Sequence, residues 1–441
     1  MNKKVTSIFE TRWGFILACV GSAVGMANIW GFPYKFGSNG NGTFLIPYLF
    51  FVILFSYVGL STEYAMGRFA GTGTLGAYEA AFKTRNENTK IGKVIGWIPL
   101  LGSLCIALGY AVIVSYVLKG LTDSVTGTLM HTKPDKWFES FSMNDFSVIP
   151  FHILIIIATL LTTLLGVKSI EKTNKVMMPL FFILFVFLAI RMAFIPNISS
   201  SYITMFSVDF KLLLDPMIWV WAMGQAFFSL SITGSGMLVY GAYLSKKENV
   251  VSGAKSTAFF DTLAAIVAVL VIIPACFAYN VDVNGGPGLL FVTLPNILQN
   301  MYGGQVIAIV LFLCVCFAGV TSLQNMFEVV LESLMYKFPK LSRILAITIL
   351  GITVLAVGIF IEPIFKWGPW MDLVSIYVIP IGASLGSITW FWVMDKRVLL
   401  EQINLGSTKE YGGTWYAIGK FIYTPISILL CAIALINGIS F

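Results

Sequence analysis

Long apolar runs recur along the whole 441-residue chain and restrict what it can fold into. They are long enough for helices that cross a bilayer, which need about 20 residues each. Only 11% of the residues are charged, against about 25% in a soluble domain, so the chain cannot face water on every side. Lipid offers no hydrogen bonds, and continuous rather than alternating apolar runs favour helices over a β-barrel. The sequence therefore predicts an all-α integral membrane protein.

The apolar runs predict eleven transmembrane helices, near residues 12–37, 43–70, 91–121, 148–166, 172–194, 215–243, 251–278, 304–337, 341–361, 370–394 and 413–437. The first run follows Lys3 and Lys4, yet it has no persuasive cleavage site, so we interpret it as a helix rather than a signal peptide. The apolar segment 289–295 is too short to span. It is either a dipping hairpin or lid, or a helix packed on the surface.

Basic residues set the predicted orientation. Most of the 28 Lys and Arg residues fall in the N-terminal segment and in every second connection, which marks the cytoplasmic side. The others lie near the opposite side: Lys35, Lys119, Lys133, Lys136, Arg191, Lys211 and Lys366. We expect a multi-pass protein of the cell (plasma) membrane with its N-terminus in the cytoplasm and its C-terminus outside. This topology explains the net charge of +7 better than nucleic-acid binding does.

The residues of enzymatic sites are missing from the sequence pattern. The cysteines lie in apolar segments without metal-binding spacing, and His131 and His152 are far apart. No nucleophile–base pair or phosphate-binding loop is evident. We therefore expect a protein that is not an enzyme.

Two predicted helices carry runs of small and hydroxyl residues, at Gly21–Asn28 and at Ser229–Gly236. Such residues commonly mark close helix packing. Here they stand at corresponding places five helices apart, which is typical of a transporter site between inverted repeats. Unwinding would free carbonyl oxygens for a cation such as Na⁺, and it would expose the positive N-terminus of a half-helix to a carboxylate. We interpret the two interruptions as one binding site.

Four groups of residues resemble motifs of the neurotransmitter:sodium symporter family, most closely its bacterial eleven-helix members that carry leucine or aromatic amino acids. They are 11–14 with 28–34, 225–231, 318–322, and 170–172 with 178–179. The resemblance implies two inverted five-helix repeats whose helices 1 and 6 are unwound at mid-membrane. The first repeat would cover residues 1–200 and the second 201–400, followed by a cytoplasmic connection and helix 11 in 401–441.

The resemblance implies two sodium sites. The first would use the carbonyls of Gly21, Val24 and Ala318 with the hydroxyls of Thr321 and Ser322. From the residues alone, adjacent Thr and Ser in an apolar helix more often bond back to their own backbone. The second site would use the Ala23 carbonyl, Asn28, Ser229 and Asp261.

Asn28 and Asp261 also stand out without the resemblance, because polar groups at mid-bilayer are costly and usually functional. The alternative is a carboxylate that serves only packing. Chloride-dependent relatives have a neutral residue at the position of Asp261 and a serine one turn on, where this chain has Ala265. We expect Asp261 to supply the negative charge, so that sodium is required and chloride is not.

The resemblance also places the substrate. Monoamine-transporting relatives have an Asp at the position of Gly25, so we expect a substrate with its own carboxylate, an α-amino acid. Tyr110 would bind that carboxylate and Phe228 would form an aromatic lid. Gly234 either makes room for an aromatic or large apolar side chain or is needed for unwinding. The implied substrate-binding residues are Ala23, Gly25, Met26, Ala27, Ile106, Tyr110, Phe228, Ser229, Ser231, Gly234, Ser322 and Met326.

The gates depart from the family pattern. Asp372 matches the acid of the outer gate, but Gly31 stands where relatives have an arginine. Lys35, one turn further on the same face, is a candidate substitute; the alternative is an unlatched gate. At the inner gate Tyr336 lies near the usual acid and Glu332 one turn earlier, and we assign no latch.

The expected function is sodium-coupled import of an amino acid by alternating access, with the bilayer as surroundings and no obligate protein partner. One alternative is a proton-coupled permease that uses Asp261 as its proton site. The other is a non-transporting, sodium-dependent amino acid sensor, which should add a soluble output domain that we do not find in the sequence.

Overall fold

The computed structural model describes residues 7–85, 87–195, 198–279, 283 and 286–439, and these residues form helices without any strand. The helices of the first part are α1 (Arg12–Ala23), α2 (Phe32–Ser38), α3 (Gly42–Phe55), α4 (Ser61–Ala70), α5 (Thr74–Lys83), α6 (Thr89–Thr126), α7 (Thr128–His131), α8 (Pro134–Ser142), α9 (Ile149–Thr163), α10 (Val167–Ala193) and α11 (Ser199–Met205).

The second part holds α12 (Pro216–Ser229), α13 (Gly236–Ala242), α14 (Val250–Ala278), α15 (Leu294–Gln299), α16 (Gly304–Lys337), α17 (Arg343–Gly358), α18 (Ile364–Asp372), α19 (Ile379–Ile388), α20 (Lys396–Asn404), α21 (Gly413–Ile418) and α22 (Thr424–Asn437). Short 3₁₀ or π stretches join or extend them: η1 (Ala27–Gly31), η2 (Ser56–Leu60), η3 (Leu212–Leu214), η4 (Leu289–Thr293), η5 (Ile359–Ile361), η6 (Leu373–Val378), η7 (Thr389–Val393) and η8 (Gly419–Tyr423).

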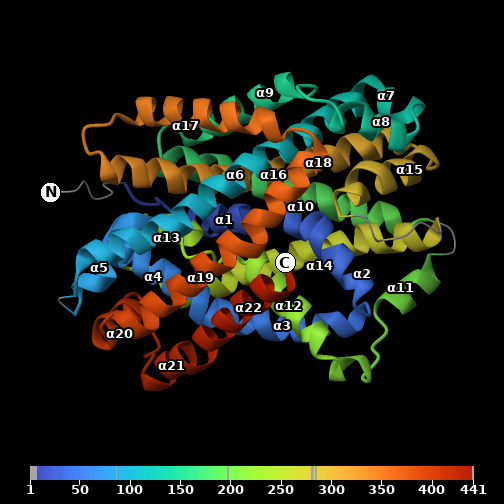
Figure 1. Ribbon diagram of the computed structural model, residues 1–441. Coiled ribbons are helices and arrows are strands. Elements are labelled where there is room, and N and C mark those ends of the chain that lie inside the picture. The colour runs from blue at the N-terminus through green and yellow to red at the C-terminus, as the bar shows by residue number, and fades with distance from the viewer. Residues whose placement is uncertain (1–6, 86, 196–197, 280–282, 284–285, 440–441) are drawn as a thin grey trace.

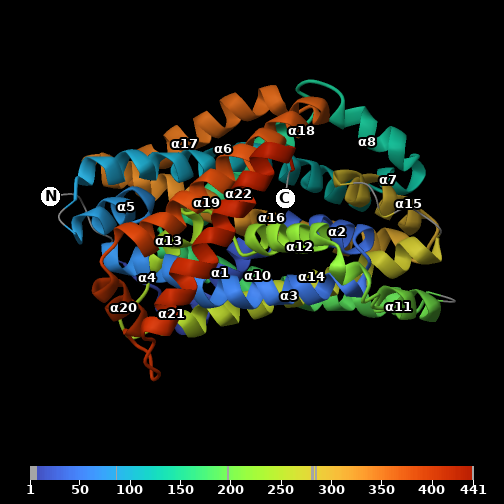
Figure 2. The same cartoon turned by 60° about the horizontal axis from the view of Figure 1, so that its bottom comes forward.

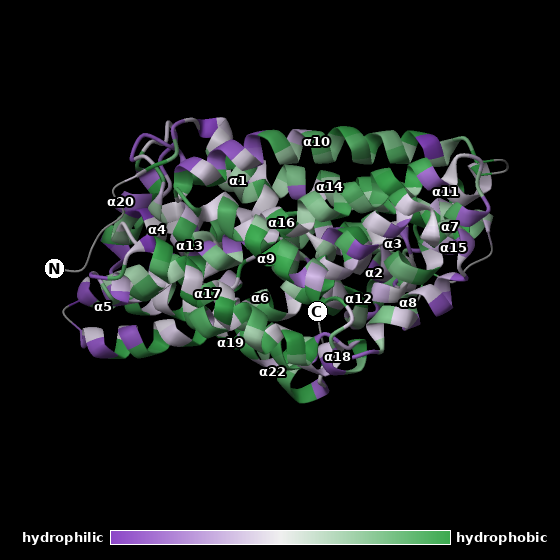
Figure 3. Cartoon of the chain, turned by 90° about the horizontal axis from the view of Figure 1, so that it is seen from above, coloured by the Kyte–Doolittle hydropathy of each residue, from purple (hydrophilic) through white to green (hydrophobic). Residues whose placement is uncertain are grey.

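The long helices run between two polar ends. Figures 1 and 2 show α5 and α20 at one end and α7, α8 and α15 at the other. Hydrophilic residues gather at these two ends, and apolar residues cover α10 and α14 between them (Figure 3). This is the distribution expected of a protein that crosses a bilayer, and it agrees with the predicted all-α membrane class.

Within the described residues, eight helical stretches are long and apolar enough to cross a membrane, or nine if the bent pair Arg12–Ala23 and Ala27–Ser38 counts as one span. Helix α9 lies in the predicted span 148–166 but has only 15 residues. The predicted span 215–243 is divided between α12 and α13. The count of eleven stays a prediction, as does the orientation in the membrane.

The short apolar segment 289–295 is helical. Stretch η4 and α15 form one short apolar helix, and Leu289, Leu290 and Phe291 are fully buried. This helix contacts α16 and α7. The segment therefore packs into the protein through buried side chains.

The chain leaves the helix at both predicted interruptions. Helix α1 ends at Ala23, Val24 is extended, and the chain continues into η1 with a bend of 57°. Helix α12 ends at Ser229, and α13 begins only at Gly236. Between them Ser231 (φ 53°) and Gly234 (φ 73°) are in the left-handed region.

Two glycines set how closely α13 packs against α4. A Cβ at Gly67 of α4 would meet the Leu238 carbonyl oxygen and lie 2.7 Å from the Ala242 nitrogen. A Cβ at Gly241 of α13 would lie 2.8 Å from the Tyr64 Cα. Small residues allow such close backbone approach in membrane proteins. This contact positions α13, and with it one side of the second interruption.

We predict that Gly67→Ala destabilises the protein by about 1–3 kcal/mol, because the added methyl meets backbone that cannot move aside. Thermal unfolding of the purified protein in detergent measures the effect. Gly368→Ala is the matched control, since a Cβ there has no neighbour within 4 Å. Equal unfolding temperatures of the two variants would contradict the assigned role of Gly67.

Candidate functional site

A cavity lies where the two interruptions meet α6 and α16. Its lining residues are Ser22, Ala23, Gly25, Met26, Ala27, Ser103, Ile106, Tyr110, Phe228, Ser231, Thr233, Gly236, Ser322, Asn325 and Met326. The predicted substrate-binding residues are among them except Ser229 and Gly234. The structure thus brings together residues more than 200 positions apart in the chain.

Gly234 does not line this cavity. Its φ is 73°, and a Cβ would lie 2.7 Å from the Tyr78 hydroxyl and also meet the Gly382 carbonyl oxygen. Tyr78 donates a hydrogen bond to the Gly234 carbonyl oxygen (3.1 Å). The position of Gly234 therefore contradicts the expectation that it makes room for the substrate side chain. It supports the alternative that glycine is required by the backbone.

Several lining residues were not predicted. Ser22, Thr233 and Gly236 belong to the predicted interruptions but were not assigned to the cavity. Ser103 and Asn325 are buried polar residues in apolar helices, which is the signal that could have identified them.

The predicted ligands of the first cation site lie together. Ser322 Oγ donates to the carbonyl oxygens of Gly21 (3.1 Å) and Val24 (3.0 Å). Thr321 Oγ1 donates back to the Ala318 carbonyl oxygen (3.1 Å), which is the local bond that the residue types alone favoured. The Thr321 Cβ lies 2.9 Å from the place of a Cβ on Gly21. We call Gly21, Val24, Ala318, Thr321 and Ser322 the first cation cluster.

The predicted side-chain ligands of the second site are bonded to each other. Asn28 Nδ2 donates to Asp261 Oδ1 (2.8 Å) and to Ser229 Oγ (3.2 Å), and Ser229 Oγ donates to Asp261 Oδ2 (2.7 Å). Asn28 and Asp261 are fully buried. Ala23, the remaining predicted ligand, ends α1 and lines the cavity. We call Ala23, Asn28, Ser229 and Asp261 the second cation cluster.

Both clusters suit a hard monovalent cation. Their candidate ligands are carbonyl, hydroxyl, amide and carboxylate oxygens, the type that unwound transporter helices offer to Na⁺. No ion pair to Asp261 occurs among the described residues. Nor do those residues include a group of three or more His, Cys, Asp or Glu suited to another metal ion.

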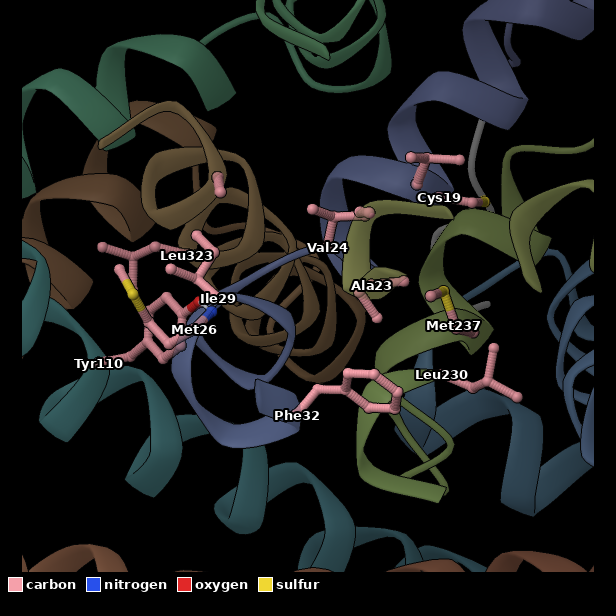
Figure 4. Packing of buried hydrophobic residues seen from close by; sticks show 14 of the residues in the cluster. Cys19, Ala23, Val24, Met26, Ile29, Phe32, Tyr110, Leu230, Met237 and Leu323 are labelled. Carbon is pink, nitrogen blue, oxygen red and sulfur yellow. Dashed lines mark hydrogen bonds between the residues drawn. The ribbon is translucent and has the colours of Figure 1, made fainter. Parts of the chain in front are cut away.

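Tyr110 and Phe228 both line the cavity. The Met26 N–H donates to the Tyr110 hydroxyl oxygen (2.9 Å), and Figure 4 shows Tyr110 beside Met26. Because Tyr110 accepts this bond, its own O–H can donate to a bound carboxylate. Phe228 is partly buried and packs with Ile106 and Met326 in a small apolar cluster. Apolar side chains around Phe228 and the polar hydroxyl of Tyr110 thus line the same cavity.

The predicted outer gate pair is not formed. Lys35 is buried and donates to Gln225 Oε1 (3.0 Å), while Asp372 is exposed. Gln225 Nε2 in turn donates to the Ala27 carbonyl oxygen (3.2 Å). Of the described ion pairs, none joins Lys35 to Asp372. The pairing fails because Lys35 is buried against α12, which matches the alternative of an unlatched gate.

Near the α5 end, Glu332 accepts bonds from the Thr72 hydroxyl and the Gly73 N–H (2.7 Å each). Tyr336 donates to Glu79 (2.8 Å). Sequence reasoning assigned no latch here.

The structure adds a buried group that sequence reasoning missed. Glu328 forms an ion pair with Arg343 and accepts a hydrogen bond from the Tyr243 hydroxyl. The sequence signal that could have identified Glu328 is an acidic residue inside an apolar run.

Glu63 was missed in the same way. Its carboxylate accepts bonds from the N–H groups of Gly234 (2.8 Å) and Met237 (3.2 Å) at the start of α13. It thereby pairs backbone groups that the interruption leaves without helical partners.

Comparisons with known proteins show which family and fold this chain resembles. The model of the sodium:neurotransmitter symporter family matches residues 7–148 and 142–439. The uncharacterized sodium-dependent transporter YhdH of Bacillus subtilis is 29% identical, with 100% of each chain covered. An uncharacterized sodium-dependent transporter of Methanocaldococcus jannaschii is 30% identical over 98% of this chain and 90% of its own length.

A solved structure has the same fold. The crystal structure of MhsT in complex with L-phenylalanine matches with a TM-score of 0.85 and 31% identity, covering 98% of this chain and 100% of that one. The curated relatives are transporters and not enzymes. Since the family model spans nearly the whole described chain, the protein belongs to the sodium:neurotransmitter symporter family.

Proposed function

We propose that this protein imports an α-amino acid together with Na⁺ by alternating access, without a requirement for chloride. The observation that carries the proposal is the carboxylate of Asp261. It is fully buried, it touches Asn28 and Ser229 beside the cavity, and it has no ion pair in the described part of the chain.

A buried carboxylate without a counter-charge is strongly unfavourable. A sodium ion at the second cation cluster would neutralise Asp261, and its charge would also attract a substrate carboxylate in the adjoining cavity. Because Asp261 brings a negative charge of its own, the site needs no chloride to balance the cation. Ala265, buried one turn further along α14, offers no polar group for an anion.

The cavity floor suits a substrate carboxylate. A Cβ at Gly25 would meet the Tyr110 hydroxyl and lie 2.8 Å from Ser322 Oγ, so the missing side chain lets these two polar groups approach the backbone where all three residues line the cavity. Ile106, Phe228 and Met326 supply an apolar wall for the substrate side chain. The complex of MhsT with L-phenylalanine is consistent with an aromatic or large apolar amino acid.

Sodium coupling is sufficient as a driving force. A charge that moves through a potential of ~100 mV releases about 2.3 kcal/mol. Two ions would supply roughly 4.6 kcal/mol, enough for about a thousandfold accumulation. We infer that the repeats expected at residues 1–200 and 201–400 rock against each other around the two clusters.

A proton-coupled permease is the second candidate, because a buried carboxylate can also be neutralised by a proton. Uptake of labelled amino acids into proteoliposomes separates the two candidates. We expect uptake with a Na⁺ gradient, equally fast when gluconate replaces chloride, and none with a proton gradient alone. Uptake with the proton gradient alone would overturn sodium coupling, and loss of uptake in gluconate would overturn chloride independence. Sodium-dependent binding without counterflow would indicate a sensor.

We predict that Asp261→Asn raises the Na⁺ concentration for half-maximal amino acid binding at least tenfold, because the charge opposite the cation is lost. Scintillation proximity binding with a Na⁺ titration measures it. Asp372→Asn is the control, since Asp372 is exposed and has no ion pair with Lys35. An unchanged Na⁺ dependence in the Asp261 variant would rule out its role as a ligand.

We predict that Gly234→Ala weakens binding of every amino acid, whatever its size. The left-handed conformation costs alanine about 1–2 kcal/mol, and the methyl would meet Tyr78 and Gly382. Competition by alanine, leucine, phenylalanine and tryptophan measures the size dependence. Gly288→Ala is the control, because a Cβ there has no neighbour within 4 Å. A variant that lost only large substrates would restore the space-making interpretation.

A further inference from the structure

Asn174 is a fully buried amide in the middle of the apolar helix α10. Its Nδ2 donates to the Ile170 carbonyl oxygen (2.9 Å) and to Gln324 Oε1 (2.6 Å). Its Oδ1 is buried and has no hydrogen-bond partner among the described residues. Helix α10 packs against both α1 and α16, which carry the first cation cluster.

The orientation of this amide is determined by its neighbours. Both partners of Nδ2 are acceptors, so the NH₂ group must face them and the oxygen must face away. Gln324 is oriented in the same manner, because its Nε2 donates to the Thr162 carbonyl oxygen (3.2 Å) and its oxygen is left for Asn174. These two amides link α9, α16 and α10 by hydrogen bonds, and they turn the Asn174 oxygen away from Gln324.

That oxygen points at Gly21. A Cβ on Gly21 would overlap Asn174 Oδ1 and would lie 3.3 Å from the Asn174 Cγ. The Thr321 Cβ is 2.9 Å from the same point. Gly21 and Thr321 are both members of the first cation cluster, so the unpartnered oxygen lies against that cluster, in the space that the glycine leaves open.

We propose that the Asn174 amide oxygen is a further ligand of the monovalent cation held by the first cation cluster. This rests on the proposed function, in which that cation is Na⁺. A buried carbonyl oxygen without a partner is unfavourable, and a hard cation removes that cost. The amide adds a sixth oxygen without adding charge. It also links cation binding to α10, which contributes no other member of the cluster.

Direct binding of ²²Na⁺ to the purified full-length protein, without amino acid, tests this proposal. We expect Asn174→Leu, which has a similar shape, to weaken Na⁺ binding at least tenfold. We expect Asn174→Asp to bind Na⁺ at least as well as the wild type, because an oxygen remains at the same place. If Asn174 served helix packing alone, the Asp variant should bind Na⁺ more weakly than the wild type, since aspartate cannot donate to Ile170 and Gln324.

Thr159→Val is the matched control, because Thr159 on α9 also carries a buried oxygen that has no hydrogen-bond partner among the residues that the structure describes. Its Na⁺ affinity should equal that of the wild type. The shift of unfolding temperature with Na⁺ gives a second reading and shows that each variant is folded. Wild-type Na⁺ affinity in Asn174→Leu, or equal losses in the Leu and Asp variants, would overturn the Asn174 assignment. A wild-type protein that binds no Na⁺ would overturn the proposed function as well.

Discussion

The half-helix α13 begins inside the protein, and Glu63 holds the N–H groups of Gly234 and Met237 there. A helix broken in apolar surroundings leaves such groups unpaired, and water cannot reach them to compensate. The carboxylate also complements the positive end of the half-helix. Gly67, one turn along α4, lets α13 come close enough for these bonds. Without this contact, the N–H groups at the second interruption would be left unpaired inside the protein.

The two buried carboxylates of Glu63 and Asp261 have different hydrogen-bond partners. The Glu63 carboxylate accepts hydrogen bonds from the backbone N–H groups of Gly234 and Met237 beside a helix N-terminus. Among the described residues, the Asp261 carboxylate accepts side-chain hydrogen bonds from the neutral groups of Asn28 and Ser229, and in the proposed function a bound Na⁺ balances its charge. The two buried amides also differ. Asn28 accepts a bond from the Gly25 N–H and donates to Asp261, whereas the Asn174 oxygen has no hydrogen-bond partner within the described part of the chain.

The two sides of the cavity are held by different forces. Near Phe228 the contacts are mostly apolar, with Ile106, Val374 and Ile379 in one cluster. Toward α17, the buried Glu328 forms an ion pair with the partly buried Arg343 and accepts a hydrogen bond from Tyr243. Apolar contacts are non-directional, whereas an ion pair leaves an uncompensated charge if one partner is removed.

The sequence by itself determined the all-helical membrane class, because lipid obliges each segment to pair its own backbone. It also located both interruptions and marked Asn28 and Asp261, since polar groups are rare in apolar helices. The resemblance to a family then identified most of the cavity lining. Only the tertiary structure decided that Gly234 faces Tyr78, that Lys35 bonds to Gln225, and which way the Asn174 amide turns. These depend on which helices become neighbours. A hydropathy pattern records only that a residue is buried, not which atom of another helix it meets.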